Sequence, residues 1–594
     1  MVGHYRMPDN IADRGLNTRP IYLTDMQRCR PRNLLSRVPR QRHWRLLAYE
    51  TDDLTGVMLM AGAETAAPEV GLPLGVEGWH AISIGVMPVQ SAEEGNGLEI
   101  QLRLSDEDVP TLITLPISST DPPSLVEMFW KTADLTGREL VISQVIVQVA
   151  PGVSPGAMRC QPARVAYVKL LPLEEKEAVL LNSDRKRHDT RRLFAHQDAN
   201  GPNGLWRLRT TREIQREIEP YRNTDFSRLY WEVGRGDLMF AHTEIGREAT
   251  FDGLSDFGRV FDRLHVESRR LLRRRNIDPF DTAVEYTHRL GLEFHAAYRV
   301  AGFRFPPPYD HFNWGNSLYD QHPEWRGVNR KGTRTPRLAY TYPEVRAYVI
   351  SLVQEMAQRP IDGICLLYCR RPPLVEYEPP LIDGFKDLFG LDPRCLDPTD
   401  ARWLTFRAGI LTRFMSEVRE TLARVASTQG RSEPFHLSAV VLSTEAENLE
   451  NAIDLRQWVA QGLVDTIIPY TSEPDLDSTT PAWTDPASLQ FFTDVVHRTP
   501  VTLAPNVLPR HMSPDDLRRR ACGIYNAGAE HMFFWDAAGG GGRANHGAMW
   551  NALRRLGHRK ELAAWQADSQ PDLSPPTRPL RTLGTWDLSY PTPG

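Results

Sequence analysis

The sequence predicts a mixed α/β protein: a parallel (β/α)8 barrel of the TIM type, preceded by an antiparallel β-sandwich. Three observations lead to this prediction. After residue 190, apolar runs alternate regularly with helical patterns, and several of these runs end in charged or aromatic residues. From 43 to 171 the chain instead carries short strand-like runs separated by turn residues. With 594 residues, the chain is also too long for one ordinary hydrophobic core.

Eight apolar or alternating runs supply the predicted barrel strands. They cover residues 192–195, 227–233, 292–300, 361–369, 436–442, 465–470, 501–507 and 531–535. The fourth run passes directly into a stiff, charged loop, Arg370-Arg371-Pro372-Pro373, as expected where a buried strand reaches the working face of a barrel. Capping patterns from Thr210 to Glu213 and from Thr341 to Glu344 predict that helices begin there.

The same changes of pattern predict the domain organisation. The even spacing of short strands in the N-terminal part is typical of a jelly-roll sandwich, which either binds carbohydrate or only braces the barrel. Five segments are expected: an Arg-rich lead (1–41), the sandwich (42–172), a charged linker (173–190), the barrel (191–560) and a C-terminal extension (561–594).

Composition and charge exclude several partners. The net charge of −5 gives no basic field for nucleic acid. The six cysteines match no zinc spacing or disulfide framework, so reduced thiols are expected. No apolar run reaches membrane-spanning length, and the opening MVGHYRMPDNIADRG has no apolar core, so we expect no membrane anchor and a cytoplasmic location. No cofactor is expected, and homo-oligomerisation stays open.

In a barrel of this type, the site is built from the C-terminal ends of the strands and the loops that follow them. The residues at these positions are rich in carboxylates and aromatic rings. Carboxylates suit acid–base work or attack on an acetal carbon, and aromatic faces suit the apolar faces of sugar rings. We therefore expect a carbohydrate substrate.

The predicted roles divide this set in two. Glu378 and Asp536 are the expected catalytic pair, with Glu232, Glu445 and Glu473 in reserve. Glu445 fits the acidic first turn of a helix equally well, Glu473 fits a turn, and Asp536 fits a loop anchor. The expected substrate-binding residues are Asp198, His295, Tyr298, Arg299, Tyr368, Arg370, Tyr377, Tyr470, Asn506 and Trp535.

Three motifs carry a resemblance to a known family. They are GLEFHAAYR at 291–299, the line YDQHPEW at 319–325, and YPEVR at 342–346 followed by Asp362-Gly363-Ile364. In this order and spacing they resemble the family 10 glycosyl hydrolase-like barrels, over about residues 190–560. The resemblance implies a TIM barrel that cleaves a glycosidic bond in an oligo- or polysaccharide.

One position departs from the family's pattern. Relatives often carry an acidic residue in strand four, where this chain has Leu367, followed by Tyr368. Two alternatives stay open, the first from the His196-x-Asp198 pair and the second from the missing acid. One is a metal-dependent barrel hydrolase or lyase that uses His196, Asp198, His295 and Asp536. The other is a carbohydrate-binding protein without chemistry.

Overall fold

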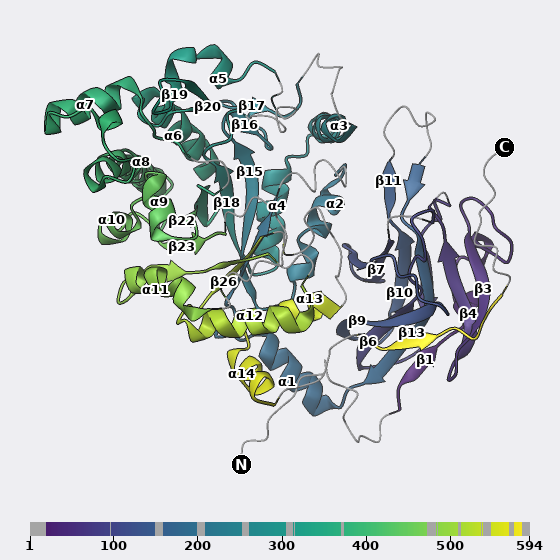
Figure 1. Cartoon of the computed structure of the whole chain (residues 1–594). Coiled ribbons are helices and arrows are strands. Elements are labelled where there is room, and N and C mark those ends of the chain that lie inside the picture. The colour runs from purple at the N-terminus through teal and green to yellow at the C-terminus, as the bar shows by residue number, and fades with distance from the viewer. Residues whose placement is uncertain are drawn as a thin grey trace.

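A computed structural model of the chain describes residues 19–584, except 64, 95–96, 149–157, 199–207, 252–259, 305–312, 314, 370–372, 472–482, 484, 509–511, 536, 538–547 and 569–574. An antiparallel N-terminal part lies beside a larger part in which helices surround a parallel sheet (Figure 1). The prediction of a mixed α/β protein is therefore confirmed. No helix in the described ranges is long and apolar enough to cross a membrane.

Two sheets make up the N-terminal part. The larger runs in the order β2-β3-β4-β13-β6-β9-β27, with β1 paired to β13 and β28 to β3, and the smaller in the order β5-β10-β7-β8. Their main strands are β3 (Trp44–Glu50), β4 (Thr55–Ala61), β5 (Val70–Pro73), β6 (Trp79–Val86), β7 (Leu98–Leu104), β8 (Thr111–Leu115), β9 (Ser124–Asp134), β10 (Glu139–Gln144) and β13 (Ala163–Pro172). Short elements complete this part: β1 (Ile21–Leu23), β2 (Leu35–Ser36), β11 (Ile146–Gln148) and β12 (Met158–Cys160).

A single hydrophobic cluster joins the two sheets. Ile84 and Val168 from the larger sheet pack in the same cluster as Ile100 and Ile142 from the smaller one. The alternation of buried and half-buried residues along β7 (Leu98–Leu104) shows how one face of each strand reaches this core.

The C-terminal extension returns to the N-terminal part. β27 (Thr577–Pro579) pairs with β9, and β28 (Thr582–Leu583) pairs with β3 (Figure 1). Arg578 lies within β27, and its guanidinium donates to the Glu127 carboxylate at 3.0 Å and to the Tyr167 hydroxyl at 2.6 Å. The segment expected to be a linker contains a helix, α1 (Glu175–Arg185), which lies between the two parts of the molecule.

The parallel strands form one sheet in the order β24-β23-β22-β21-β18-β15-β14-β26-β25. Their bounds are β14 (Leu193–Gln197), β15 (Phe226–Arg235), β18 (Glu293–Arg299), β21 (Gly363–Leu367), β22 (His436–Val441), β23 (Thr466–Pro469), β24 (Thr502–Leu503), β25 (Asn506–Val507) and β26 (Met532–Trp535). Only Ala504 and Pro505 separate β24 from β25, which pair with β23 and β26 respectively. The sheet is therefore strongly curled.

Alternate residues of these strands face two different clusters. Tyr230, Ala297, Cys365, Val440 and Phe533 pack together on the inner side of the curled sheet. Their sequence neighbours pack outward against the helices. Which face a residue joins therefore depends on whether it occupies an odd or even position in its strand.

Helices cover the outer side of this sheet (Figure 1). They are α2 (Thr211–Arg216), α3 (Val260–Arg274), α4 (Pro279–Arg289), α5 (Leu318–Gln321), α6 (Pro343–Ala357), α7 (Pro379–Phe389), α8 (Ala401–Thr428), α9 (Glu445–Glu450), α10 (Leu455–Ala460), α11 (Gln490–Val496), α12 (Pro514–Asn526), α13 (Ala548–Leu553) and α14 (Arg559–Asp568). Short strands complete this part. β16 (Leu238–Met239) pairs antiparallel with β15 and parallel with β17 (Arg247–Glu248), and β19 (Arg326–Val328) forms a separate hairpin with β20 (Arg334–Leu338).

The two predicted capping patterns have different outcomes. Thr210 caps α2 as expected, because its hydroxyl accepts a hydrogen bond from the Glu213 amide. The pattern at Thr341 does not cap α6, whose N-cap is Tyr342 without a side-chain bond. The Thr341 hydroxyl donates instead to the buried carboxylate of Glu378 at 2.8 Å, and a charged acceptor makes the stronger hydrogen bond.

Candidate active site

Three charged side chains meet where strands β14, β15 and β18 end. Arg299 donates through Nε to Glu232 Oε1 at 2.8 Å, and its Nη2 lies 2.7 Å from Glu232 Oε2. The same Nη2 donates to Asp198 Oδ2 at 2.8 Å. Because one nitrogen contacts both carboxylates, the two nearest oxygens lie no further apart than roughly 5.5 Å, the upper end of the spacing that retaining glycosidases use.

Strand parity and a β-bulge bring these residues together. Asp198 follows His196, Glu232 follows Tyr230 and Arg299 follows Ala297, each two positions further along the inner face of its strand. The pairing of β15 with β18 shifts between Glu232 and Gly234. A bulge at this point increases the local twist, and the pairing resumes beyond it with Gly234 opposite Tyr298. Bulges are frequent next to functional sites.

Burial gives the two carboxylates different environments. Glu232 is fully buried, whereas Asp198 keeps 8% of its surface exposed. Burial raises the pKa of Glu232, and the neighbouring Asp198 carboxylate adds to this rise, while the Arg299 guanidinium opposes it. The pKa of Arg299 is raised despite burial, because two carboxylates surround it. This arrangement favours a proton on Glu232.

Aromatic rings cover the charged group. The Trp535 indole lies 5.2 Å from the Arg299 guanidinium, 3.9 Å from the stacked His196 ring and 5.2 Å from the Tyr470 ring. Asn506 holds the Trp535 backbone through its side-chain oxygen, which accepts the amide hydrogen at 3.2 Å. The buried Asn506 Nδ2 has no hydrogen-bond partner among the described residues. This is the arrangement expected where a polar ligand binds beside an aromatic face.

Glu378, the favoured catalytic residue, has a different position. It is fully buried at the N-cap of α7. Its oxygens accept hydrogen bonds from the Thr341 hydroxyl at 2.8 Å, the Glu376 amide at 3.1 Å and the Val328 amide at 3.3 Å. Glu376 belongs to the same loop as Glu378, whereas Val328 lies in β19 and Thr341 precedes α6. Glu378 therefore connects its loop to the β19–β20 hairpin and to the start of α6. Burial raises its pKa.

Two of the expected aromatic residues face the wrong side of the sheet. The Tyr298 hydroxyl donates to the Gly236 carbonyl, and the ring packs in the outer cluster. The Tyr368 hydroxyl contacts Met415 of α8 at 3.1 Å. Neighbouring residues of a strand face opposite sides of the sheet. Tyr298 follows the inward-facing Ala297, and Tyr368 follows the inward-facing Leu367, so both tyrosines face the helices. The placement predicted for them is therefore wrong. Tyr377 likewise packs on α8, with its ring 4.9 Å from that of Trp403.

His295 and Glu445 also lie away from the strand-end cluster. His295 is four residues before Arg299, roughly 13 Å along the strand, and its ring lies 4.8 Å from Tyr230 and 5.3 Å from His436. Burial lowers its pKa to about 4. Glu445 sits in the first turn of α9 and pairs with Arg456 at 2.7 Å. The helix-turn interpretation of Glu445 therefore describes its position correctly.

Three predicted site residues, Arg370, Glu473 and Asp536, lie outside the described residues. Among the described residues, the structure thus brings together Asp198, Glu232, Arg299, Tyr470, Asn506 and Trp535. None of the described residues form a group of three or more His, Cys, Asp or Glu side chains placed to hold a metal ion. For the proposed metal set, His196 and His295 lie near opposite ends of their strands.

The motifs behind the family resemblance have structural positions. Asp362 accepts hydrogen bonds from the Phe294 amide and from His288, each at 2.7 Å, at the N-terminal ends of the strands. Gly363 has no space for a side chain, because a Cβ there would lie 2.4 Å from the His436 carbonyl oxygen. Leu367, at the position of the family's acidic residue, packs in the inner apolar cluster.

Residues 259–505 match the family model described as glycosyl hydrolase-like 10, which confirms the resemblance inferred from the motifs. Arg299 lies inside the matched segment, and Asp198 and Glu232 lie before it. No curated protein matches the chain.

Solved structures of carbohydrate-active enzymes align with part of this chain. α-L-Fucosidase isoenzyme 2 from Paenibacillus thiaminolyticus is 13% identical, with a TM-score of 0.40 over 63% of this chain and 49% of its own. A β-galactosidase from the psychrophilic Marinomonas ef1 is 11% identical, with a TM-score of 0.39 over 64% of this chain and 61% of its own. The catalytic domain of β-amylase from Paenibacillus polymyxa is 10% identical, with a TM-score of 0.40 over 64% of this chain and 99% of its own. The match thus spans about half the length of the fucosidase and about three fifths of the length of the β-galactosidase. With TM-scores below 0.5, these likenesses identify neither a substrate nor an activity for it.

Proposed function

We propose that this protein is a glycoside hydrolase that cleaves a glycosidic bond at the strand-end cluster of Asp198, Glu232 and Arg299. The observation that carries the proposal is the pair of carboxylates held on one guanidinium nitrogen under the Trp535 ring. The match of residues 259–505 to a glycosyl hydrolase-like family supports the same reaction class.

The proposal includes a complete eight-stranded barrel with an N-terminal β-sandwich. The pairing of residues 502–503 with β23 and of residues 506–507 with β26 supports closure of the ring. The hydrophobic cluster common to both N-terminal sheets supports the sandwich. In a closed barrel, the strand-end cluster lies at the C-terminal face, where barrel enzymes have their sites.

The two carboxylates have different roles in the proposed reaction. Asp198, the more exposed, attacks the anomeric carbon and displaces the leaving oxygen, which takes the proton of Glu232. Water then attacks the anomeric carbon and releases the Asp198 carboxylate, and the attacking water gives one proton to Glu232. Two displacements at one carbon retain its configuration, in keeping with the short spacing of the pair.

Arg299 orients the two carboxylates, and the aromatic rings supply contacts for the sugar. The Arg299 guanidinium keeps Asp198 ionised and fixes the direction of both carboxylates, which pre-organises the pair before substrate binds. Trp535 and Tyr470 supply faces for the apolar side of a sugar ring. The unpartnered Asn506 Nδ2 is a donor for a sugar hydroxyl.

Glu232→Gln tests the assignment. On substrates with a poor leaving group, turnover should fall about 10²–10⁴-fold, the usual contribution of a general acid. On aryl glycosides whose phenol leaves without a proton, the first displacement should be nearly unaffected. The measurement is initial rates over a panel of aryl glycosides and oligosaccharides, with the anomeric configuration of the first product determined by NMR.

Glu445→Gln is the matched control, because it removes an exposed carboxylate bound to Arg456. Its rates should equal those of the native protein. Equal rates in Glu232→Gln and native protein would reject the assignment. If the native protein binds glycans and turns none over, a carbohydrate-binding role without chemistry replaces the proposal.

A further inference from the structure

An open pocket of about 360 Å³ lies where helices α8 and α9 pack side by side (Figure 1). It is lined by the loop after β21 (373–377), by the segment before α8 (398–399), by Arg407 of α8 and by the end of α9 (450–451). The loop follows β21 and α9 follows β22, so the pocket lies near the same strand ends as Glu232. Its size is within the range of small-ligand sites.

Arg407 is the most deeply buried charged side chain of this pocket. Only 6% of its surface is exposed. Its Nη2 donates to the Val375 carbonyl at 2.9 Å and to the Glu450 carbonyl at 2.8 Å. Among the described residues, its Nε has no hydrogen-bond partner and no carboxylate forms an ion pair with it. A guanidinium has five N–H donors, so Arg407 keeps donors for an acceptor bound in the pocket.

Carboxylates near Arg407 disfavour an anionic ligand. Burial lowers the pKa of Arg407, and four neighbouring side chains oppose this effect: Tyr377, Glu378, Glu376 and Glu450. Three of these neighbours are acidic, and two of the three, Glu376 and Glu450, line the pocket itself. An anion that approached the guanidinium would meet these carboxylates as well.

The charges that line the pocket nearly cancel. Arg407, Glu376 and Glu450 are the charged residues of the lining. Burial raises the pKa of Glu376, while the Thr335 hydroxyl and the charges of Arg407 and Arg337 oppose the rise. A raised pKa reduces the charge on Glu376 and leaves mainly one cation and one anion. Such a lining suits an uncharged ligand.

The acidic residues on either side of Thr399 do not alter this balance in favour of an anion. Asp397 accepts hydrogen bonds from the Thr399 amide at 2.8 Å and from its hydroxyl at 2.5 Å. Asp400 pairs with Arg402 at 2.7 Å. These contacts add no positive charge that an anion could use.

Neutral polar groups and apolar rings complete the lining. The Tyr377 hydroxyl makes no hydrogen bond in the described part of the chain. Asn451 donates through Nδ2 to the Glu447 carbonyl at 2.8 Å, which leaves its side-chain oxygen as an acceptor. Pro373 and Pro398 supply apolar surface. Donors and acceptors beside apolar rings suit a sugar ring with several hydroxyl groups, whereas a hydrocarbon would leave these polar groups without partners.

We propose that this pocket is a second carbohydrate site, which binds one uncharged sugar residue of a glycan chain. Arg407 donates to its hydroxyl groups and Glu450 accepts from them. Tyr377 and Asn451 bind further hydroxyl groups. The site needs none of the chemistry of the strand-end cluster, so the proposal does not depend on the proposed hydrolase activity.

Calorimetric titration of the full chain tests the proposal. The neutral probes are hexasaccharides of cellulose, starch, chitin, xylan and mannan, and the charged probes are hexasaccharides of polygalacturonate and chitosan. At least one neutral probe should bind, and both charged probes should bind at least tenfold more weakly. Amide hydrogen exchange in the presence of the bound probe should slow in segments 373–377 and 448–453, which locates the binding at this pocket.

Two variants change the pocket and keep the Arg407 hydrogen bonds, because those bonds end on carbonyl oxygens. Glu450→Gln should weaken binding about 10–100-fold, the loss expected for a hydrogen bond to a charged group. Tyr377→Phe should weaken it about 2–10-fold, the loss of a neutral hydrogen bond. Glu445→Gln removes an exposed carboxylate at the other end of α9 and is the matched control, which should bind like the native protein.

Four outcomes would overturn the proposal. They are no binding by any neutral probe, equal binding by a charged probe, unchanged binding in both pocket variants, and binding that survives in these variants but is lost in Glu232→Gln. Binding at the pocket by a protein that hydrolyses none of the probes would support this proposal while it rejects the proposed hydrolase activity.

Discussion

His558→Gln should destabilise the protein at neutral pH and not at alkaline pH. His558 is 5% exposed and joins Asp184 of α1 to Asp225, which precedes β15. Its pKa rises from an unfolded value of about 6.5 to about 9 in the folded chain. Each unit of pKa shift corresponds to about 1.4 kcal/mol, so the histidinium contributes about 3 kcal/mol to the free energy of unfolding.

The sign of the effect fixes the pH window. Below pH 6.5 the proton is bound in both the folded and the unfolded chain, and the full contribution is present. Between pH 6.5 and 9 only the folded chain keeps the proton, so the contribution falls by about 1.4 kcal/mol per pH unit. Above pH 9 it is absent.

Urea denaturation at pH 6 and pH 9.5 measures this contribution. The difference between native protein and His558→Gln should be about 3 kcal/mol at pH 6 and close to zero at pH 9.5. Because other groups titrate alike in both proteins, they cancel in the difference. His188→Gln, at an exposed position in the same region, should differ from native protein at neither pH. A difference between native protein and His558→Gln that is the same at both pH values would refute the reasoning.

Three further predictions concern the parallel strands and the loops beside them. Arg299→Leu leaves the buried Asp198 and Glu232 side chains without their guanidinium partner and should cost about 3–5 kcal/mol in urea denaturation. Adding Glu232→Gln should recover part of this loss, and no recovery would contradict the described pairing. Glu378→Gln places an amide against two backbone N–H groups and should cost about 1–3 kcal/mol while turnover persists, whereas loss of turnover in a stable variant would restore Glu378 as a catalytic residue. Turnover should fall as pH rises through the raised pKa of Glu232, because the reaction needs its proton; a rate that rises over this range would contradict the assignment.

The alternation of apolar runs and helices predicted the strands well. All eight predicted strand regions contain parallel strands, and the outer bounds of each region differ from the observed ones by no more than two residues. The reason is that fully buried parallel strands need continuous apolar runs, and few other elements of this length do. The seventh region is interrupted at Ala504 and Pro505, since proline cannot donate a ladder hydrogen bond.

The candidate site was predicted less well, because position near a strand end does not fix direction. Tyr298 and Arg299 are adjacent in sequence, yet one faces the helices and the other faces the carboxylates. Counting alternate positions from the inward-facing Ala297 would have separated them. For Glu378, no sequence pattern indicates that Thr341 and the β19–β20 hairpin supply hydrogen bonds to its carboxylate.

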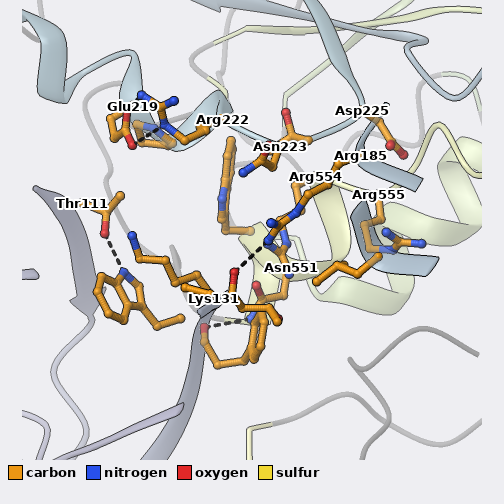
Figure 2. Close-up of a pocket in the computed structure, with 18 of the residues that line it drawn as sticks. Thr111, Lys131, Arg185, Glu219, Arg222, Asn223, Asp225, Asn551, Arg554 and Arg555 are labelled. Carbon is orange, nitrogen blue, oxygen red and sulfur yellow. Dashed lines mark hydrogen bonds and ion pairs between the residues drawn. The ribbon is translucent and has the colours of Figure 1, made fainter. Parts of the chain in front are cut away.

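A cavity of about 320 Å³ between the N-terminal sheets and the parallel-sheet part (Figure 2) left no signal in the sequence. Trp79, Lys131, Arg185 and Arg554 come from four separate segments, and none belongs to a motif. The charged segment 173–190, expected as a linker, supplies Arg185 because it forms a helix between the two parts of the molecule. Such a cavity becomes visible only when tertiary packing is known.

The most direct test of the central claim is peptide mass spectrometry after reaction with a 2-deoxy-2-fluoro aryl glycoside, which traps the covalent intermediate of a retaining glycosidase. The panel of aryl glycosides used for the Glu232→Gln rates identifies which sugar the reagent should carry. The label should be found on Asp198, and Glu232→Gln should still accept it from a reagent with a good leaving group. A label on Glu378 or Asp536, or turnover with inversion and no label, would contradict the account.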